Sequence, residues 1–283
     1  METKIEDKTY ISVKDHLVSG EVFEIKTTNI NGLLKTTPPP SPETLYKYYE
    51  SEEYISHTDS KETFTDKIYQ AVKKYSLKKK KKLIQKYHPE AKTILDIGSG
   101  TGDLIQYLKN SYTCVSTEPN DQARSLSIKK GNNVVSDINE LGKQKFDVIM
   151  MWHVLEHVPN IDNELSKIKD LLADNGILII AVPNYESYDA KHYKQAWAAY
   201  DVPRHLWHFN KISMREILQC KNLFVVKILP LVFDSFYVSL LSEKIKTGKQ
   251  NWFKAFYIGM KSNLMAKSSG DYSSLIYISK KQP

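Results

Sequence analysis

Histidine and acidic side chains gather in two short stretches of this sequence, and both stretches contain groups that can move protons. The first is His153-Val-Leu-Glu-His157, and the second runs from Asp201 to His208 through Arg204 and His205. Histidine titrates near neutral pH and suits a general base, and a neighbouring charged group can orient it and shift its pKa. We expect His205 to act as a base and His153 to shape the pocket, unless both histidines only pack the interior.

The first stretch also matches H-x-x-E-H, the zinc-binding string of one class of metalloprotease. That chemistry needs a helix that places both histidines on one face. Pro159 follows only two residues after His157, which argues against a helix through this point. We therefore expect no metal site.

A glycine-rich stretch, Thr93-Ile-Leu-Asp-Ile-Gly-Ser-Gly-Thr-Gly-Asp-Leu104, must position a ligand for any such chemistry. The apolar, β-branched start predicts a strand buried on both faces, and a new apolar period from Asp103 predicts a helix. The three glycines between them allow positive φ and close approach to the main chain. The helix then points its first N–H groups at the loop, so the pattern predicts a site for a nucleotide-like ligand.

The spacing of the glycines and the acidic residues around them indicate which ligand binds. A dinucleotide motif G-x-G-x-x-G would place its third glycine at position 103, which is Asp103 here. Asp96 and Asp103 make the crevice acidic, which suits an ammonium and a sulfonium better than two phosphates. S-adenosylmethionine carries both cations, so we expect it as the cofactor.

The Asp-Ile-Gly-Ser-Gly-Thr-Gly string closely resembles the glycine-rich motif of class I S-adenosylmethionine-dependent methyltransferases. The resemblance covers about residues 85 to 283 and implies an α/β fold with a doubly wound, mostly parallel sheet of seven strands. The strand patterns that fit this fold alternate with helical patterns and end in a last, antiparallel strand. The expected strands are 93–97, 112–117, 133–136, 146–152, 177–182, 224–229 and 275–278, with an Asn175-Gly176 turn before the fifth.

Acidic residues at the ends of the next strands complete the expected cofactor site. Glu118 lies sixteen residues beyond Gly102, where a carboxylate can accept hydrogen bonds from ribose hydroxyls, although it could instead cap a helix before Pro119. In the family, an acid and an apolar residue after the third strand hold adenine, which corresponds to Asp137 and Ile138; Asp137 could also be a turn residue. The expected cofactor-binding residues are Asp96, Gly98, Ser99, Gly100, Gly102, Glu118, Pro119, Asp137, Ile138 and Trp152.

Residues 184 to 210 depart from the repeated strand and helix pattern and are rich in aromatic residues and histidine. Insertions after the fifth strand usually carry specificity, so we expect a lid over the acceptor. The string Asp201-x-Pro-Arg-His-Leu-x-His-Phe resembles a bacterial methyltransferase subfamily that includes ubiquinone-biosynthesis-type enzymes. The expected substrate-binding residues are Tyr200, Asp201, Arg204 and His208.

Residues 1 to 60 differ from the methyltransferase-like region, 61 to 283. Alternating residues 22–25, the Asn31-Gly32 turn and a proline-rich segment predict a small hairpin extension and a stiff linker. Related methyltransferases often carry a cysteine zinc ribbon here. Thr28 and Asn31 stand at the matching positions and cannot supply thiolates, so we expect a degenerate, zinc-free extension. The tyrosines of 45–57 are expected to pack.

Composition limits the remaining classes of function. The 283 residues are 41% hydrophobic and 26% charged, and the net charge is +7. The run Lys78 to Lys82 fits the solvent-exposed face of a helix, so nucleic-acid binding is not favoured. No segment has the pattern of a membrane span or a signal peptide, so we expect a cytoplasmic protein. Cys114 and Cys220 are expected to be buried fillers without a disulfide.

The residues and the resemblance together predict an S-adenosylmethionine-dependent methyltransferase (EC 2.1.1.-) of bacterial type that acts on a small or medium-sized acceptor. The methylated atom, whether oxygen, nitrogen or carbon, and the oligomeric state are not indicated by the sequence. Two alternatives remain open: an NAD-dependent oxidoreductase, and a protein that binds S-adenosylmethionine for interaction without catalysis.

Overall fold

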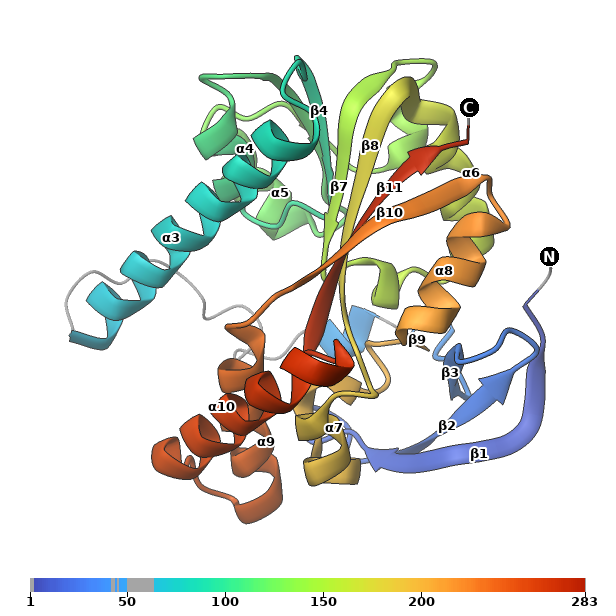
Figure 1. The fold of residues 1–283 in the computed structure, drawn as a ribbon, viewed down its shortest axis with the longest axis vertical. Helices are drawn as coiled ribbons and strands as arrows, with labels where there is room; N and C mark the ends of the chain where they lie inside the picture. Colours follow the sequence, from blue (N-terminus) through green and yellow to red (C-terminus); the bar gives the residue numbers. More distant parts are fainter. Residues whose placement is uncertain (1–2, 42–43, 45, 50–63, 283) are drawn as a thin grey trace. The chain divides into compact units, whose positions relative to one another are not determined.

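A computed structural model describes residues 3–41, 44, 46–49 and 64–282 of the chain (Figure 1). The tyrosine-rich segment 45–57, for which we expected packing, lies largely outside the described residues.

Helices and strands alternate from residue 64 onward, as the sequence patterns predict. The strands are β1 (Ile5–Lys14), β2 (Val22–Thr28), β3 (Leu34–Thr37), β4 (Thr93–Ile97), β5 (Thr113–Thr117), β6 (Val134–Val135), β7 (Phe146–Trp152), β8 (Leu172–Pro183), β9 (Trp207–His208), β10 (Leu223–Pro230) and β11 (Ser274–Lys281). The α-helices are α3 (Phe64–Tyr87), α4 (Asp103–Leu108), α5 (Asp121–Lys129), α6 (Ile161–Leu171), α7 (Tyr188–Tyr193), α8 (Lys211–Gln219), α9 (Asp234–Thr247) and α10 (Trp252–Ser269). The 3₁₀ helices are η1 (Tyr46–Tyr49), η2 (Ile138–Leu141), η3 (Leu155–His157), η4 (Lys194–Ala196) and η5 (Ala198–Tyr200).

A seven-stranded sheet forms the centre of the fold, with strands in the order β10-β11-β8-β7-β4-β5-β6. β4 pairs in parallel with both β5 and β7, and β5 pairs in parallel with β6. The apolar residues of β4 and β7 are almost completely buried, because a strand inside a parallel sheet has no face in water. The predicted α/β fold with a mostly parallel sheet is confirmed.

The chain divides into two compact units, which we describe separately. The N-terminal-sheet unit holds the described residues of Met1–Ser51, His153–Leu165 and Ile180–Ile278. The glycine-loop unit holds those of Glu52–Trp152, Ser166–Ile179 and Ser279–Pro283.

A four-stranded antiparallel sheet, in the order β1-β2-β3-β9, characterises the N-terminal-sheet unit. Its fourth strand, β9, comes from the expected lid, and Leu34 and Lys35 of β3 pair with His208 and Trp207. The expected N-terminal hairpin therefore exists, but it continues into a sheet with residues far along the chain.

The lid segment 184–210 is core rather than a mobile flap. Tyr193, Trp197 and Tyr200 are buried in one cluster with Phe23 and Ile25 of β2. The carboxylate of Asp189, fully buried, accepts hydrogen bonds from Trp197 Nε1 (2.8 Å), Ser262 Oγ (2.6 Å) and Ser273 Oγ (2.7 Å). These contacts fix the segment, because moving it would leave several buried polar groups without partners.

Three expectations from the sequence need correction. The Asn175-Gly176 pair lies inside β8 instead of forming a turn before it. Cys220 is exposed and Cys114 is only partly buried. The lysine run is only partly an exposed face, since Lys80 Nζ lies 4.1 Å from the ring centroid of Trp152 and Lys81 donates a hydrogen bond to Ser111.

Among the described residues, no helix combines the length and the apolar character that crossing a membrane requires.

Candidate active site

The glycine loop connects the buried end of β4 to the first turn of α4 in the glycine-loop unit. Gly98, Gly100 and Gly102 all adopt left-handed backbone conformations, with φ of 68°, 55° and 78°. A Cβ at position 102 would lie 2.1 Å from Ser127 Oγ and 2.3 Å from Asn132 Nδ2, whereas one at position 100 would meet nothing within 4 Å. Gly102 is therefore required by packing as well as by φ, and Gly100 leaves its side of the loop open to a ligand.

Glu118 ties the end of β5 to this loop. Its Oε2 accepts a hydrogen bond from the Gly100 N–H at 2.7 Å, and Oε1 accepts one from the Asn120 N–H at 2.9 Å. Because a carboxylate has about four acceptor positions, these two bonds leave capacity for further donors. The helix cap that the sequence left open is supplied by Asn120, whose side chain accepts from the Ala123 N–H. Glu118 thus orders the loop, and Pro119 follows it directly.

Asp96 lies at the end of β4 and is almost completely buried. Burial and the nearby Glu118 carboxylate raise the pKa of Asp96 to about 7, against the opposing effect of the Lys80 ammonium. At neutral pH the group is thus poised between its two protonation states, and a cation placed beside it would favour the carboxylate.

Four buried side-chain polar atoms of this unit have no hydrogen-bond partner within the described part of the chain: Ser99 Oγ, Asn132 Oδ1, Trp152 Nε1 and Ser279 Oγ. Ser99 lies on the glycine loop, and Trp152 lies at the end of β7. An unpaired buried donor is costly, and a bound ligand is one way to satisfy it. Ser99 and Trp152 belong to the cofactor set expected from the sequence.

Asp103 does not make the crevice acidic in the way we expected. Its carboxylate pairs with Lys73 Nζ and Lys130 Nζ, each at 2.7 Å. Burial acts to raise the pKa of Asp103, but the hydrogen bonds from the two ammonium groups hold it below its usual value. Its charge is therefore compensated within the protein, and Asp96 and Glu118 remain as the acids at the loop.

Asp137 is exposed and caps η2. Its Oδ1 accepts a hydrogen bond from the Asn139 N–H at 2.7 Å, and the Glu140 side chain accepts from the Asp137 N–H, which completes a capping box. Ile138, the next residue, is buried. The turn role that the sequence left open for Asp137 is thus present in the structure.

In the N-terminal-sheet unit, His153 is held between two carboxylates. Its Nε2 lies 2.9 Å from Asp234 Oδ2 and its Nδ1 lies 3.4 Å from Glu156 Oε1. Burial disfavours the imidazolium, but the two carboxylates outweigh it and raise the pKa of His153 to about 10. The side chain is 37% exposed, so solvent screening weakens the two charge pairs. The upward shift of the pKa still leaves His153 protonated at neutral pH.

The backbone of His153 is left-handed, with φ of 57°, and Asp201 also has a positive φ, of 37°. Such conformations are unfavourable for residues with a side chain and concentrate at functional sites. Both residues belong to the expected site.

Glu156, His157 and His205 form a second cluster in the same unit. One carboxylate oxygen and one nitrogen from each imidazole lie within 4.8 Å of one another, so these three groups could hold a metal ion. Burial opposes ionisation of Glu156, but its ion pair with His153 and the nearby His205 and His157 lower its pKa to about 2. Burial and the neighbouring His205 lower the pKa of His157 to about 4, so His157 is neutral.

His205 has one ring nitrogen engaged and one without a hydrogen bond in the described part of the chain. Its Nδ1 lies 2.9 Å from the Ala199 carbonyl oxygen, which only accepts hydrogen bonds, so Nδ1 is the donor and Nε2 is the nitrogen that could accept a proton. Asp201 Oδ2 lies 3.9 Å from Nε2, too far for a hydrogen bond but close enough to stabilise a positive charge. The His205 ring meets that of His157 edge to face, with centroids 4.6 Å apart.

The remaining residues of the expected substrate set are engaged within the protein. Arg204 is buried and pairs with Asp15 Oδ1 at 3.0 Å and Asp201 Oδ1 at 2.7 Å. The Thr36 hydroxyl donates its hydrogen to the His205 carbonyl oxygen at 2.7 Å. Thr36 Oγ1 must therefore accept in its 2.9 Å contact with His208, and His208 Nε2 is the donor. Burial, with His205 nearby, lowers the pKa of His208 to about 3.

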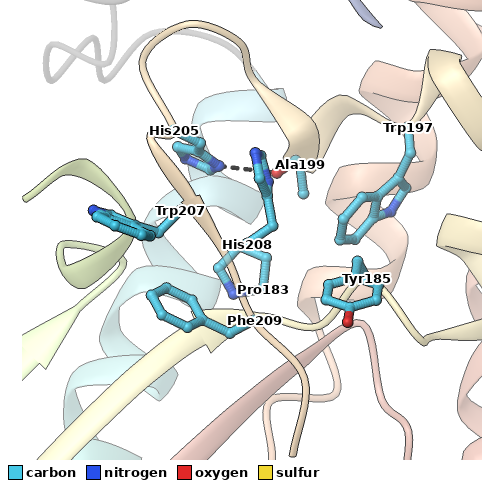
Figure 2. A pocket seen from close by; sticks show the side chains of 8 residues that line it. All are labelled: Pro183, Tyr185, Trp197, Ala199, His205, Trp207, His208 and Phe209. Carbon is cyan, nitrogen blue, oxygen red and sulfur yellow. Dashed lines mark hydrogen bonds between the residues drawn. The ribbon is translucent and has the colours of Figure 1, made fainter. Parts of the chain in front are cut away.

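A small pocket lies beside His205 and His208, and Figure 2 shows both rings among aromatic side chains. Its empty volume of about 180 Å³ includes space that is open to solvent, so the enclosed space is far smaller than an ordinary ligand pocket. Tyr200, Asp201 and Arg204 do not line it. The lining residues are Pro183, Tyr185, Trp197, Ala199, His205, Trp207, His208 and Phe209.

Sequence reasoning missed three residues of these sites. Asp234 lies far along the chain from His153, and nothing in the sequence links them. Lys80 was hidden in a lysine run that fits an exposed helix face. Glu156 stands in the H-x-x-E-H string, where a role beside His153 and His205 could have been considered.

Comparison with known proteins agrees with this geometry. A family model described as a methyltransferase domain matches residues 69–228, more than half of the chain. The ubiquinone biosynthesis O-methyltransferase of Haemophilus ducreyi is 29% identical over 108 residues, which cover 33% of this chain and 46% of that enzyme. The chain thus aligns with less than half the length of this curated relative.

Solved structures share the fold. A methyltransferase from Thermotoga maritima that depends on S-adenosylmethionine has a TM-score of 0.52 at 16% identity, covering 77% of this chain and 96% of that one. The magnesium protoporphyrin IX methyltransferase of Synechocystis, solved with bound S-adenosylhomocysteine, has a TM-score of 0.52 at 12% identity, covering 85% and 94%. At these identities the similarity shows the fold alone.

Proposed function

Since the chain belongs to the family of proteins that contain this methyltransferase domain, we propose that it transfers the methyl group of S-adenosylmethionine to a small or medium-sized acceptor. The cofactor supplies a methyl group on a sulfonium, a good leaving group. Catalysis then rests mainly on alignment, with a base needed only where the acceptor atom holds a proton.

The observation that carries the proposal is the state of the glycine loop. The loop has three left-handed glycines, and its Gly100 N–H donates to the Glu118 carboxylate. The buried Ser99 Oγ and Trp152 Nε1 have no partners among the described residues. These atoms fit a ligand that offers acceptors, and the buried Asp96 carboxyl, with a pKa of about 7, fits one that also carries a cation. S-adenosylmethionine has both. Asp96, Glu118, Ser99 and Trp152 would hold it, with the glycines giving room and Pro119, Asp137 and Ile138 extending the site.

For the acceptor we propose an oxygen atom and His205 as the base. The name of the Haemophilus relative supports oxygen, and His205 Nε2, which makes no hydrogen bond among the described residues, supports the base. His153, protonated between Asp234 and Glu156, suits an electrostatic role instead.

We further propose that the N-terminal extension supports the acceptor-binding segment. β3 pairs with β9, and Asp15 pairs with Arg204, next to His205. An extension without zinc can in this way keep a structural role.

The function is tested in two steps. The first step is thermal denaturation. Added S-adenosylhomocysteine should raise the midpoint of thermal unfolding by several degrees, because a ligand that binds only the folded state stabilises it. NAD, the cofactor of the alternative oxidoreductase, should leave the midpoint unchanged. Formation of S-adenosylhomocysteine is then followed with phenolic, amine and carbon-acid acceptors. Binding without turnover on any of them would favour a non-catalytic protein, and stabilisation by NAD alone would overturn the proposal.

A further inference from the structure

The helices α9 and α10 form a hairpin in the N-terminal-sheet unit (Figure 1), and α10 is apolar on both of its sides. Its inner side carries small residues, and Ala255, Gly259 and Ala266 are among those buried. Its outer side repeats large apolar residues at every fourth position: Trp252, Phe256, Met260 and Leu264. A helix that is apolar all round is normally covered on all sides. On the outer face of α10, the Phe256 ring stacks on Phe236 of α9, but the large apolar residues remain mostly exposed among the described residues.

The exposure on this face is far beyond that of scattered surface residues. Phe253 is 92% exposed and Trp252 is 62% exposed, at the turn where α10 begins, and Phe256 and Tyr257 are both more than half exposed one turn later. We call this the aromatic face, comprising Trp252, Phe253, Phe256, Tyr257, Met260 and Leu264. Contiguous apolar surface of this kind marks an interaction site.

The charge around the aromatic face is positive. Residues 234–269 contain six lysines, no arginine and only two acidic residues, Asp234 and Glu243. Asp234 is paired with His153, and Glu243 is buried and paired with Lys254 at 3.0 Å. Lys246 and Lys249 lie at the tip of the hairpin, shortly before Trp252 in the sequence. Lys267 lies in the last turn of α10, and Lys261, also on α10, holds its ammonium over the Tyr188 ring of α7. The surface therefore offers aromatic rings and ammonium groups together, and both of its acids are engaged elsewhere.

We propose that the aromatic face docks on the surface of an anionic lipid bilayer. Tryptophan, tyrosine and phenylalanine insert at the level of the lipid headgroups, and lysines beside them are attracted to anionic headgroups. The helix lies in the interface with its inner side on the protein and its outer side in lipid. The proposal is independent of the methyltransferase activity.

Two other occupants fit the surface less well. A second copy of the chain in a symmetric dimer would place the same patch against itself, which brings lysines against lysines. Single-stranded nucleic acid would stack on the rings, but Met260, Leu264 and Met265 offer it no stacking surface, and arginine is absent from the hairpin.

The test is flotation of the full chain with vesicles of phosphatidylcholine alone and of phosphatidylcholine with about 30% phosphatidylglycerol, a mixture chosen to give a negative surface potential. We expect binding to the anionic vesicles that is at least tenfold stronger and weakens with salt. The triple variant Trp252→Ser, Phe253→Ser, Phe256→Ser should lose at least tenfold in partitioning, and so should Lys246→Glu, Lys249→Glu. All five positions are remote in sequence from the proposed cofactor-binding residues, and the three aromatic residues are exposed, so circular dichroism should match the wild type. The thermal midpoint should fall only slightly, through loss of the ring contact between Phe256 and Phe236.

Ile128→Ser is the matched control, because Ile128 is 55% exposed on α5 and lies in the other unit. It should leave vesicle binding unchanged. The proposal is overturned if wild type fails to float with anionic vesicles, or if neither the aromatic nor the charge variant weakens binding. A concentration-dependent dimer that the triple variant abolishes, without vesicle binding, would assign the face to a second copy instead.

Discussion

Asp234, at the start of α9, lies 2.9 Å from Nε2 of His153, which directly follows β7. The pair, with Glu156 on the other ring nitrogen, keeps a positive imidazole in place at neutral pH. It also distinguishes the two candidate catalytic histidines. Both ring nitrogens of His153 face carboxylates, whereas His205 has a carbonyl partner at Nδ1 and no hydrogen bond at Nε2 in the described part of the chain.

Replacing Asp234 by Asn should lower the pKa of His153 substantially from its value of about 10. A histidine whose pKa is raised by folding contributes stability that is complete below its unfolded pKa of about 6.5 and disappears as the pH rises through about 10. The free energy of unfolding of the wild type should thus exceed that of Asp234→Asn near pH 6, and the two should converge above about pH 10. Denaturant titrations at several pH values measure this. Asp162→Asn, which removes a surface pair with Lys221, is the control, and an equal difference at all pH values would contradict the assignment.

Glu118→Ala should weaken S-adenosylhomocysteine binding by roughly 1–3 kcal/mol, because buried ribose hydroxyls lose a partner. The Gly100 and Asn120 N–H groups lose theirs as well. Isothermal calorimetry measures the affinity. The control is Glu90→Ala, because Glu90 is an exposed residue that precedes β4. An affinity equal to that of the control would remove Glu118 from the cofactor site.

The glycine loop offers a matched pair of substitutions. Gly100→Ala meets only the strain of a left-handed backbone, about 1–2 kcal/mol, because no atom lies within 4 Å of the new Cβ. Gly102→Ala has the same backbone strain and adds a clash of the new Cβ with Ser127 and Asn132. Overpacking of this kind typically costs about 1–3 kcal/mol more. Urea denaturation should therefore rank Gly102→Ala below Gly100→Ala in stability. The reverse ranking would show that the loop is packed differently.

Cofactor binding should depend on pH through Asp96. If a cation binds beside this carboxyl, whose pKa is about 7 in the free protein, binding favours the ionised form and releases a proton below pH 7. The affinity for S-adenosylhomocysteine, which keeps the ammonium, should thus rise by up to about tenfold per pH unit below pH 7 and level off above it, as one proton requires. Calorimetry in buffers of different ionisation enthalpy counts the proton. Asp96→Asn should abolish both effects, and a pH dependence that survives this change would assign the proton to another group.

His205→Asn should reduce the turnover number for a hydroxyl acceptor by about 10²–10⁴-fold and flatten the acidic limb of the pH–rate profile, because a general base contributes about that much. Steady-state kinetics with saturating cofactor measures it, with His16→Asn, at an exposed position of the same unit, as the control. Cofactor affinity should not change. A turnover number within about twofold of wild type, with an unaltered pH profile, would exclude His205 as the base.

The sequence alone was enough to predict the central sheet and the glycine loop. Both depend on local rules, since β4 is a β-branched and mostly apolar run and each of the three glycines takes a backbone conformation that other residues avoid. The position of Glu118 was predictable for a related reason. Parallel pairing of β4 with β5 brings the strand ends to one edge, with Ile97 beside Thr117. The strand and helix patterns set this arrangement in advance.

Only the tertiary structure shows which charged side chains are neutralised by a partner and which are held charged. Asp103, acidic in the sequence, is compensated by Lys73 and Lys130, and His153 is protonated because Asp234 comes from a distant helix. The helix α10 was also not recognisable, because apolar residues on both of its sides remove the one-sided period that predicts a surface helix. Periodicity and spacing report on neighbours along the chain. The partner of a charge and the exposure of a face depend on which distant segments the fold brings together, and no local pattern contains that information.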